Sequence, residues 1–101
     1  MEQVKERVAT KKKINFSEIK KWNVIFHNDN KTTMEFVIFV LIEIFKHSET
    51  NAEELTYKIH TEGTTIVGQY VYEIAQQKAS ETLNLAAMYG YPLNVTIEKC
   101  E

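Results

Sequence analysis

The stretch KWNVIFHNDNKTTMEFV, residues 21–37, contains a change from one type of secondary structure to another. Its first part, residues 21–27, alternates in part between apolar and polar side chains and predicts a β-strand. The Asn-Asp-Asn sequence at 28–30 follows, and these residue types favour turns and helix caps. Thr32 or Thr33 can then cap a helix. The stretch therefore predicts a strand, a polar loop and a helix in direct succession.

Residues 34–46 are ambiguous on local grounds. Their β-branched and aromatic content would suit a buried strand, whereas their length and the preceding cap favour a helix. Glu35 stands where a capping-box acid belongs if Thr32 is the cap. In a helix, Phe39 and Ile42 lie three residues apart on one face, so that the helix is apolar on nearly all sides. We predict a helix.

A second helix and a second strand follow. Thr50 and Glu53 have the spacing of a capping box, and Gly63 stands where a left-handed cap would end the helix. Residues 64–72 are rich in β-branched and aromatic side chains, which favour a strand. Gly68 within this segment predicts a bulge or a close backbone approach.

The last third of the chain predicts one more helix and one more strand. Residues 73–89 have a helical apolar period that stops at Gly90, and residues 92–98 alternate strictly. The apolar positions of the helix are Ile74, Ala75, Ala79, Leu83, Ala86 and Ala87. The order β-α-α-β-α-β predicts an α/β (α+β) sandwich, in which a small, mainly antiparallel three-stranded sheet is covered on one face by three helices.

The length and the charge distribution indicate one domain with an N-terminal arm. The chain has 101 residues and a net charge of −2, but residues 1–22 are basic and the remainder is acidic. We expect residues 1–20 to form a flexible arm and residues 21–101 to form the core domain. An acidic body without a basic stripe would repel phosphates, so nucleic acid is not an expected partner.

Membrane insertion and secretion are not expected either. The most hydrophobic stretch, residues 36–45, is about half of the ~20 residues that a bilayer requires, and Glu43 interrupts it. No apolar signal-peptide core follows the charged N-terminus. The single cysteine, Cys100, cannot form an intrachain disulfide, which fits a reducing compartment. We expect a cytoplasmic protein.

The sequence contains no usual catalytic or cofactor signature. It has no glycine-rich phosphate loop, no Gly-x-Ser-x-Gly elbow and no closely spaced Cys and His quartet. His27, Asp29 and His60 lack the spacing of a metal-binding motif. Asp29 and His60 could form an acid–base pair, but the sequence indicates no nucleophile that such a pair would activate. We therefore expect no enzyme, no metal and no cofactor.

The polar loop and the helices around it contain what a site for a protonated amine requires. Such a site needs hydrogen-bond acceptors, a nearby negative charge and an adjoining apolar cavity. Residues 28–30 supply oxygens, and Met34, Val37 and Ile59 supply apolar surface next to His60. From the residues alone, a capped turn, core side chains and a surface histidine at a helix end are the favoured interpretations.

Four ordered motifs resemble the ClpS family of ATP-dependent Clp protease adaptors over about residues 21–100. They read Asn28-Asp29-x-x-Thr32-x-Met34-Glu35-Phe36-Val37, Ile59-His60-x-x-Gly63, Val67-Gly68-x-Tyr70-x-Tyr72-Glu73-x-Ala75-x-x-Lys78-Ala79 and Pro92-Leu93-x-x-Thr96-x-Glu98-Lys99. The resemblance implies a bacterial N-end rule adaptor, which binds N-terminal Leu, Phe, Tyr or Trp and delivers the substrate to the ClpA unfoldase of the ClpAP protease.

The resemblance also implies roles for individual residues. The α-amino group of the degron would be bound by Asn28, Asp29, Asn30 and His60. Its side chain would enter a pocket lined by Thr32, Met34, Val37, Thr56, Ile59 and Leu93. Met34 matches a gatekeeper that excludes β-branched side chains. Glu73 and Lys78 match the face that docks on the N-terminal domain of ClpA, and the arm matches an extension that assists substrate hand-over.

This sequence departs from the family's pattern at several positions. Asn30 stands where the family has an acid that contacts the ammonium group, which predicts weaker or altered degron binding. The alternative function is a regulatory or scaffold protein that docks on the unfoldase but binds degrons weakly. Thr56 replaces a usual methionine and predicts a roomier or more polar pocket rim. Phe39 and Ile42 replace polar residues and predict an extra contact or self-association surface.

Overall fold

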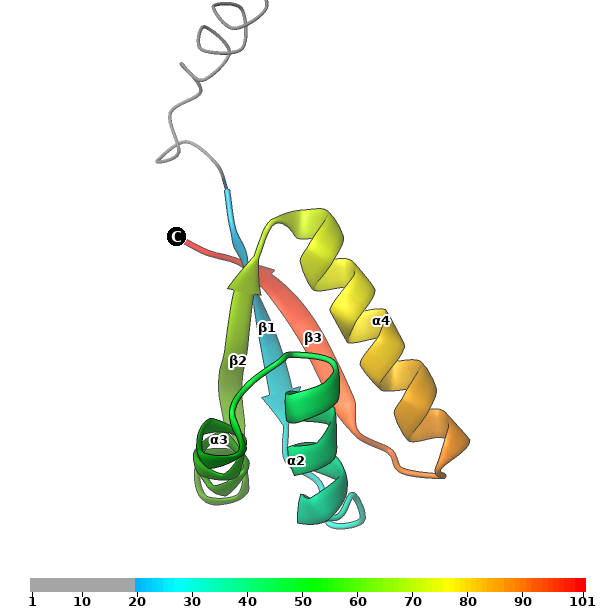
Figure 1. Cartoon of the computed structure of the whole chain (residues 1–101). Helices are drawn as coiled ribbons and strands as arrows, with labels where there is room; N and C mark the ends of the chain where they lie inside the picture. The colour runs from blue at the N-terminus through cyan, green and yellow to red at the C-terminus, as the bar shows by residue number, and fades with distance from the viewer. Residues whose placement is uncertain (1–19) are drawn as a thin grey trace, which may run out of the picture.

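In the part of the chain that the structure describes, three strands and three helices follow one another in the predicted order β-α-α-β-α-β (Figure 1). The computed structural model describes residues 20–101, so the predicted arm lies outside the described residues except for Lys20. The elements are β1 (Trp22–His27), α2 (Met34–Glu43), α3 (Glu49–Glu62), β2 (Thr64–Tyr70), α4 (Tyr72–Met88) and β3 (Asn94–Lys99).

The first strand in the sequence is the central strand of the sheet. The order is β2-β1-β3, and β1 runs antiparallel to both neighbours. Phe26 of β1 pairs with Thr65 on one side and with Val95 on the other. Since β1 leads directly into the polar loop, the loop begins at the middle of one end of the sheet rather than at its edge.

One bulge interrupts the pairing of β1 with β2. Val24 pairs with Gly68 but Ile25 pairs with Ile66, which leaves Val67 as the extra residue. A Cβ atom on Gly68 would lie 2.5 Å from the Tyr70 hydroxyl oxygen, so any larger residue there would displace the Tyr70 side chain. The predicted bulge is thus present, and the close approach at Gly68 is made by an aromatic side chain.

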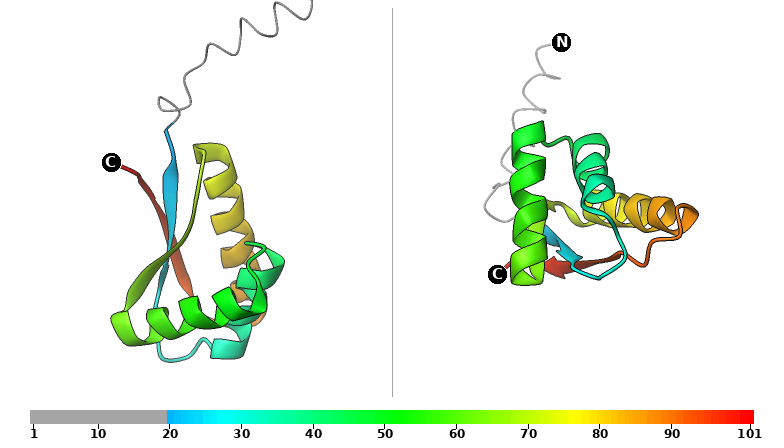
Figure 2. Two further views of the ribbon diagram at one scale, coloured as in Figure 1. Left: turned by 60° about the vertical axis from the view of Figure 1, so that its left-hand side comes forward. Right: turned by 90° about the horizontal axis from the view of Figure 1, so that it is seen from below.

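The three helices lie on the same side of the sheet, with α2 and α4 over its face and α3 across its lower end beside β2 (Figure 2). Alternation along the strands follows from this arrangement: Val24 and Phe26 of β1 and Val95 of β3 are buried against the helices. The opposite face is polar in part. There the His27 Nε2 lies 2.8 Å from the Thr96 hydroxyl oxygen, and no described element covers it.

The helix ends differ in part from those predicted. Thr33, one of the two expected caps, begins α2, and its hydroxyl oxygen accepts from Phe36 N at 3.1 Å. The capping box that required Thr32 is therefore not formed. The second box was wrong, because Ser48 caps α3 two residues before Thr50 and accepts from Asn51 N at 3.1 Å. The predicted end of α3 at Gly63 is confirmed by its positive φ of 92°.

The buried face of α4 is formed by small side chains. Ala75, Ala79, Thr82 and Ala86 face the sheet, whereas three of the predicted apolar positions, Ile74, Leu83 and Ala87, are exposed. Thr82 is 0% exposed, and its hydroxyl donates to the Lys78 carbonyl oxygen at 2.8 Å. Small residues allow the helix to lie close to the strands, and Ala75, Ala79 and Ala86 are buried as predicted, but an apolar count alone missed Thr82 and included three exposed positions.

Candidate functional site

A cavity of about 330 Å³ lies between the polar loop, the first turns of α2 and the last turns of α3. It is lined by Asn28, Asp29, Asn30, Thr32, Met34, Val37, Thr56, Ile59 and His60. These are all the residues predicted to bind an α-amino group and all but one of those predicted for the side-chain pocket. The volume is near the lower end of the ~300–1,000 Å³ typical of small-molecule sites, which suits one large side chain.

Asp29 organises the loop from within. Its Oδ1 accepts from Lys31 N at 2.8 Å and from Thr32 N at 2.7 Å, and its Oδ2 accepts from the Thr32 hydroxyl at 2.8 Å. Partial burial raises the pKa of the Asp29 carboxyl, but the hydrogen bonds from Thr32 and Lys31 together lower it below its ordinary value. The loop therefore carries one fixed negative charge, whose oxygens already have partners.

A backbone hydrogen bond joins the loop to the end of α3. Asn28 N donates to the Gly63 carbonyl oxygen at 2.8 Å. Because Gly63 ends α3 only three residues after His60, this bond holds the two amide-bearing loop residues and the imidazole around one opening. The side chains of Asn28, Asn30 and His60 are all exposed at that opening.

The inner part of the cavity is apolar. Val37 and Ile59 are buried there, and Met34 lies at the rim with 43% of its surface exposed. Thr56 is also buried, but its hydroxyl donates to the Ala52 carbonyl oxygen at 2.7 Å. The proton of that hydroxyl is thus used within α3, so Thr56 adds less polarity to the cavity than the sequence suggested.

The cavity therefore has two chemically different ends. The outer end carries amide oxygens, an imidazole and the Asp29 charge, and contains no Lys or Arg side chain. The inner end is built from aliphatic carbon and thioether. Such an arrangement can accept hydrogen bonds from a cationic group and bury the apolar side chain attached to it. Among its lining residues there is no cysteine or serine nucleophile.

Three of the predicted functional residues lie elsewhere. Leu93 is buried in the core and is not among the residues that line the cavity, so its predicted contact with a ligand has no support in the geometry. Glu73 is exposed in the first turn of α4. Lys78 lies on the same helix but is half-buried.

The Lys78 ammonium is bound inside the molecule. Its Nζ donates to the Ile44 carbonyl oxygen at 2.7 Å, where α2 ends. The Nζ atom also lies 5.8 Å from the Phe45 ring centroid and 5.4 Å from the Tyr70 ring centroid. Burial raises the pKa of the Tyr70 hydroxyl above its ordinary value. A cation at a helix C-terminus is favoured by the helix dipole. No local pattern in the sequence predicts this contact, because its partners are 34 residues apart.

Comparison with known proteins identifies the family. A family model described as "ATP-dependent Clp protease adaptor protein ClpS" matches residues 17–96. The chain belongs to the ClpS family. A ClpS adapter protein from Clostridium acetobutylicum is 44% identical over 92 residues, covering 91% of this chain and 89% of the relative. One from Treponema denticola is 43% identical and covers 83% of each chain.

A solved structure of the family supports the same assignment. Agrobacterium tumefaciens ClpS2, bound to L-phenylalaninamide, matches with a TM-score of 0.79 and 32% identity, covering 82% of this chain and 100% of that one. The predicted fold class is confirmed, as is the prediction that this ClpS-family chain is a Clp protease adaptor and not an enzyme.

Two further properties concern residues 20–101. None of the helices in this part of the chain is long and apolar enough to cross a membrane. Within the same residues, no three His, Cys, Asp or Glu side chains are grouped so that they could hold a metal ion.

Proposed function

We propose that this adaptor binds the N-terminal Leu, Phe, Tyr or Trp of substrate proteins in the cavity at the start of α2 and delivers them to the ClpA unfoldase of ClpAP in the bacterial cytoplasm. The observation that carries the proposal is the pairing of a polar opening with an apolar interior in one cavity. L-phenylalaninamide, the ligand of the Agrobacterium tumefaciens relative, combines a free α-amino group with an aromatic side chain.

The polar opening suits an ammonium group. An α-ammonium has three N–H donors, and burying any of them without an acceptor is costly. The amide oxygens of Asn28 and Asn30 and a ring nitrogen of His60 are acceptors at the opening. The Asp29 carboxylate adds a negative field while its own oxygens hold the loop in shape. An acetylated amine would lose the charge and would leave these acceptors without donors.

The apolar interior suits a large side chain. Burying a Phe or Leu side chain contributes about 1.5–3 kcal/mol. Met34, Val37 and Ile59 supply the surface on which that side chain would pack. A branch at Cβ would meet Met34 at the rim, which is the basis for excluding Val and Ile. A misfit of one methylene in such a pocket changes affinity by roughly 1–3 kcal/mol.

A peptide titration tests this proposal. Fluorescent peptides of identical sequence should begin with Phe, with Val or with N-acetyl-Phe, and anisotropy should give the three Kd values. We expect the Phe peptide to bind at least about tenfold more tightly than the other two, since each loses ~1.4 kcal/mol or more. Met34→Ala should reduce the discrimination against Val, whereas Met88→Ala, which changes an exposed methionine on α4, is the matched control. Equal binding of all three peptides would refute the proposal.

Delivery to ClpA requires a second surface. Glu73 is exposed at the start of α4, between the exposed apolar residues Tyr72 and Ile74. We propose that Glu73 contacts the N-terminal domain of ClpA, and that Lys78 supports the same face from its partly buried position. Glu73→Lys should abolish binding of that domain in calorimetry and leave peptide affinity unchanged. Glu81→Lys, the same change two turns along α4, is the control; equal loss in both would contradict the assignment.

The neutral Asn30 favours the second candidate, an adaptor that docks on the unfoldase but holds degrons weakly. A charge-assisted hydrogen bond is roughly twice as strong as a neutral one. Asn30→Asp should therefore tighten binding of the Phe peptide by about tenfold and make it more sensitive to salt. An unchanged Kd would show that the missing charge does not limit affinity.

A further inference from the structure

A second hollow lies on the other flank of the first turns of α2. Its volume is about 270 Å³, and it is lined by Thr33, Glu35, Phe36, Phe39, Tyr89 and Tyr91. We call it the aromatic groove. Four of its six residues are aromatic, and they come from α2 and from the turn between α4 and β3. Nothing in the proposed binding of an N-terminal residue uses this groove.

The aromatic rings lie close to one another, and two of the four, Phe39 and Tyr89, are exposed to solvent. The Phe36 ring centroid lies 5.4 Å from that of Tyr89 and 4.9 Å from that of Tyr91. Gly90, with a φ of 78°, turns the chain between the two tyrosines, whose rings are within 10° of parallel. Phe39 is 47% exposed and Tyr89 60% exposed. Large apolar groups exposed together mark a surface that binds something.

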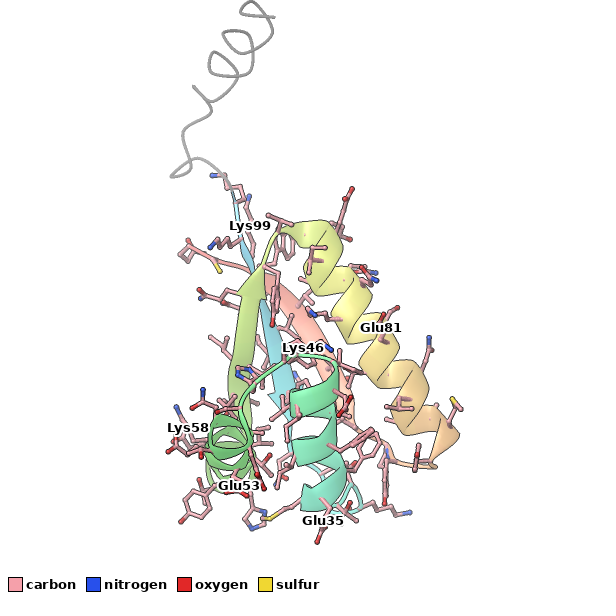
Figure 3. All side chains as sticks on the ribbon, in the orientation of Figure 1. Glu35, Lys46, Glu53, Lys58, Glu81 and Lys99 are labelled. Carbon is pink, nitrogen blue, oxygen red and sulfur yellow. The ribbon has the colours of Figure 1, made fainter. Side chains whose placement is uncertain are left out.

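The groove and the first cavity lie on either side of the same turn of α2. Thr32 and Met34 line the cavity, and the alternate residues Thr33 and Glu35 line the groove, so one helical turn separates the two. Figure 3 shows Glu35 at the end of α2 that faces away from the sheet. A helix with its side chains is about 10–12 Å across, and an extended chain advances ~3.3–3.6 Å per residue. A chain leaving the cavity across this turn reaches the groove about three or four residues later.

The surface on the other side of the cavity is different. The outer face of α3 carries Glu53, Glu54 and Lys58 around a single aromatic residue, Tyr57. Glu53 and Lys58 project from that helix in Figure 3. An apolar segment of a bound substrate can therefore contact several aromatic side chains on the α2 side of the cavity. On the α3 side it would meet one tyrosine among charged side chains.

We propose that the aromatic groove is a second subsite for the same substrate chain, which takes a large apolar side chain at about its fourth or fifth residue. This inference rests on the proposed function, because the first residue must occupy the cavity. The groove carries the Glu35 carboxylate and contains no Lys or Arg side chain. It thus suits a segment that is apolar and neutral or basic, and it disfavours an acidic one.

Three ligands separate this inference from the proposal on which it rests. They are L-phenylalaninamide, a Phe-initiated hexapeptide with Ser at positions 2–6, and the same hexapeptide with Trp at position 4 or 5. With the unaltered protein, calorimetry should show the better Trp peptide binding about five- to tenfold more tightly than the Ser peptide. Replacing Trp by Asp should give binding no tighter than that of the Ser peptide.

Variants then locate the effect. Phe39→Asp and Tyr89→Ser should remove the advantage of the Trp peptide while leaving the affinity for L-phenylalaninamide unchanged. Tyr57→Ser, at the exposed tyrosine on α3, should retain the advantage. Circular dichroism of each variant checks the fold, and the comparison of peptides on the unaltered chain does not depend on any variant.

The outcomes are distinct. If the Trp and Ser peptides bind equally while L-phenylalaninamide still binds, the groove is not a substrate subsite and the inference is overturned. If sedimentation shows a dimer that Phe39→Asp dissociates, the occupant is a second copy, which also overturns it. If none of the ligands binds, the proposed function fails first.

Discussion

At its N-terminal end, α2 is held mainly by groups a few residues away, with one longer-range bond from Asn28 N to the Gly63 carbonyl oxygen, whereas its C-terminal end is held by side chains from distant parts of the chain. The Thr33 cap and the Asp29 loop contacts span two or three residues each. Lys78 reaches the Ile44 carbonyl from 34 residues away, and His47 Nε2 contacts the Val67 carbonyl oxygen at 2.7 Å from 20 residues away.

This difference explains why the cavity is at one end of the helix and not at the other. Local contacts fix the shape of the N-terminal loop and leave the side chains of Asn28 and Asn30 exposed for a ligand. At the C-terminal end, Lys78 Nζ binds the Ile44 carbonyl oxygen, which would otherwise lack a partner within the helix. The same ammonium contacts the rings of Phe45 and Tyr70, so these groups are satisfied inside the molecule. One end of α2 is therefore arranged for binding and the other for stability.

The largest effect should come from breaking the C-terminal end. Lys78→Met removes a charge-assisted hydrogen bond and the cation–π contacts with Phe45 and Tyr70. We expect the free energy of unfolding to fall by about 2–3 kcal/mol. For a domain of this size that lowers Tm by roughly 10–20 °C in a thermal melt.

Two variants control that experiment. Lys78→Arg should recover part of the lost stability, because a guanidinium can also donate to a carbonyl and lie over a ring. Lys58→Met, which changes an exposed lysine on α3, should change Tm little. Equal effects of the two Met variants would show that the contact with Ile44 contributes nothing.

A smaller effect, with a distinctive pH dependence, is expected at the N-terminal loop. Asp29→Ala removes three hydrogen bonds and should cost about 1–2 kcal/mol in the free energy of unfolding near neutral pH. Because folding lowers the pKa of Asp29, its stabilising contribution is present above the unfolded pKa of about 3.9 and is lost as the pH falls through the folded value.

Urea unfolding at several pH values measures this. The difference in the free energy of unfolding between the parent chain and Asp29→Ala should be largest at pH 6 and should decrease as the solution is acidified below about pH 4. A gap that is constant down to the lowest pH would mean that the charge on Asp29 has no part in holding the loop.

The smallest effect should come from the helix cap. Thr33→Ala removes the acceptor for Phe36 N, which costs about 1 kcal/mol. Ser48→Ala removes the equivalent cap of α3 and is the matched comparison. Chemical denaturation should give similar losses for both, but only Thr33→Ala should also weaken the Phe peptide, since α2 bears Met34 and Val37. Equal peptide affinity in both variants would separate the cap from the cavity.

The two ends of α2 also show which structural features could be predicted from the sequence. The N-terminal loop was predictable, because turn and cap preferences act over two to four residues and are visible in Asn28, Asp29 and Thr33. The cap of α3 was misplaced by two residues because Ser48 and Thr50 are both good caps, and the choice depends on where the chain leaves α2. The order of the elements followed from their periodicity.

What the sequence could not show was set by contacts between distant segments. Thr82 is polar yet fully buried, because its hydroxyl finds the Lys78 carbonyl within α4. Phe39 and Ile42 were predicted to share one face, but Phe39 lines the aromatic groove while Ile42 packs partly against the core. Leu93 matched a pocket position in the motif, but it is buried in the core and is not among the residues that line the cavity.

Gly68 restricts how this sequence can drift. Any side chain at that position would collide with the ring of Tyr70, the same ring over which the Lys78 ammonium lies. A substitution there would therefore force the Tyr70 ring to move, and that ring is part of what closes the far end of α2. Gly68 on an edge strand is thus linked to Lys78 on α4 through one tyrosine ring, so a change at any of the three positions should be designed with the other two in view.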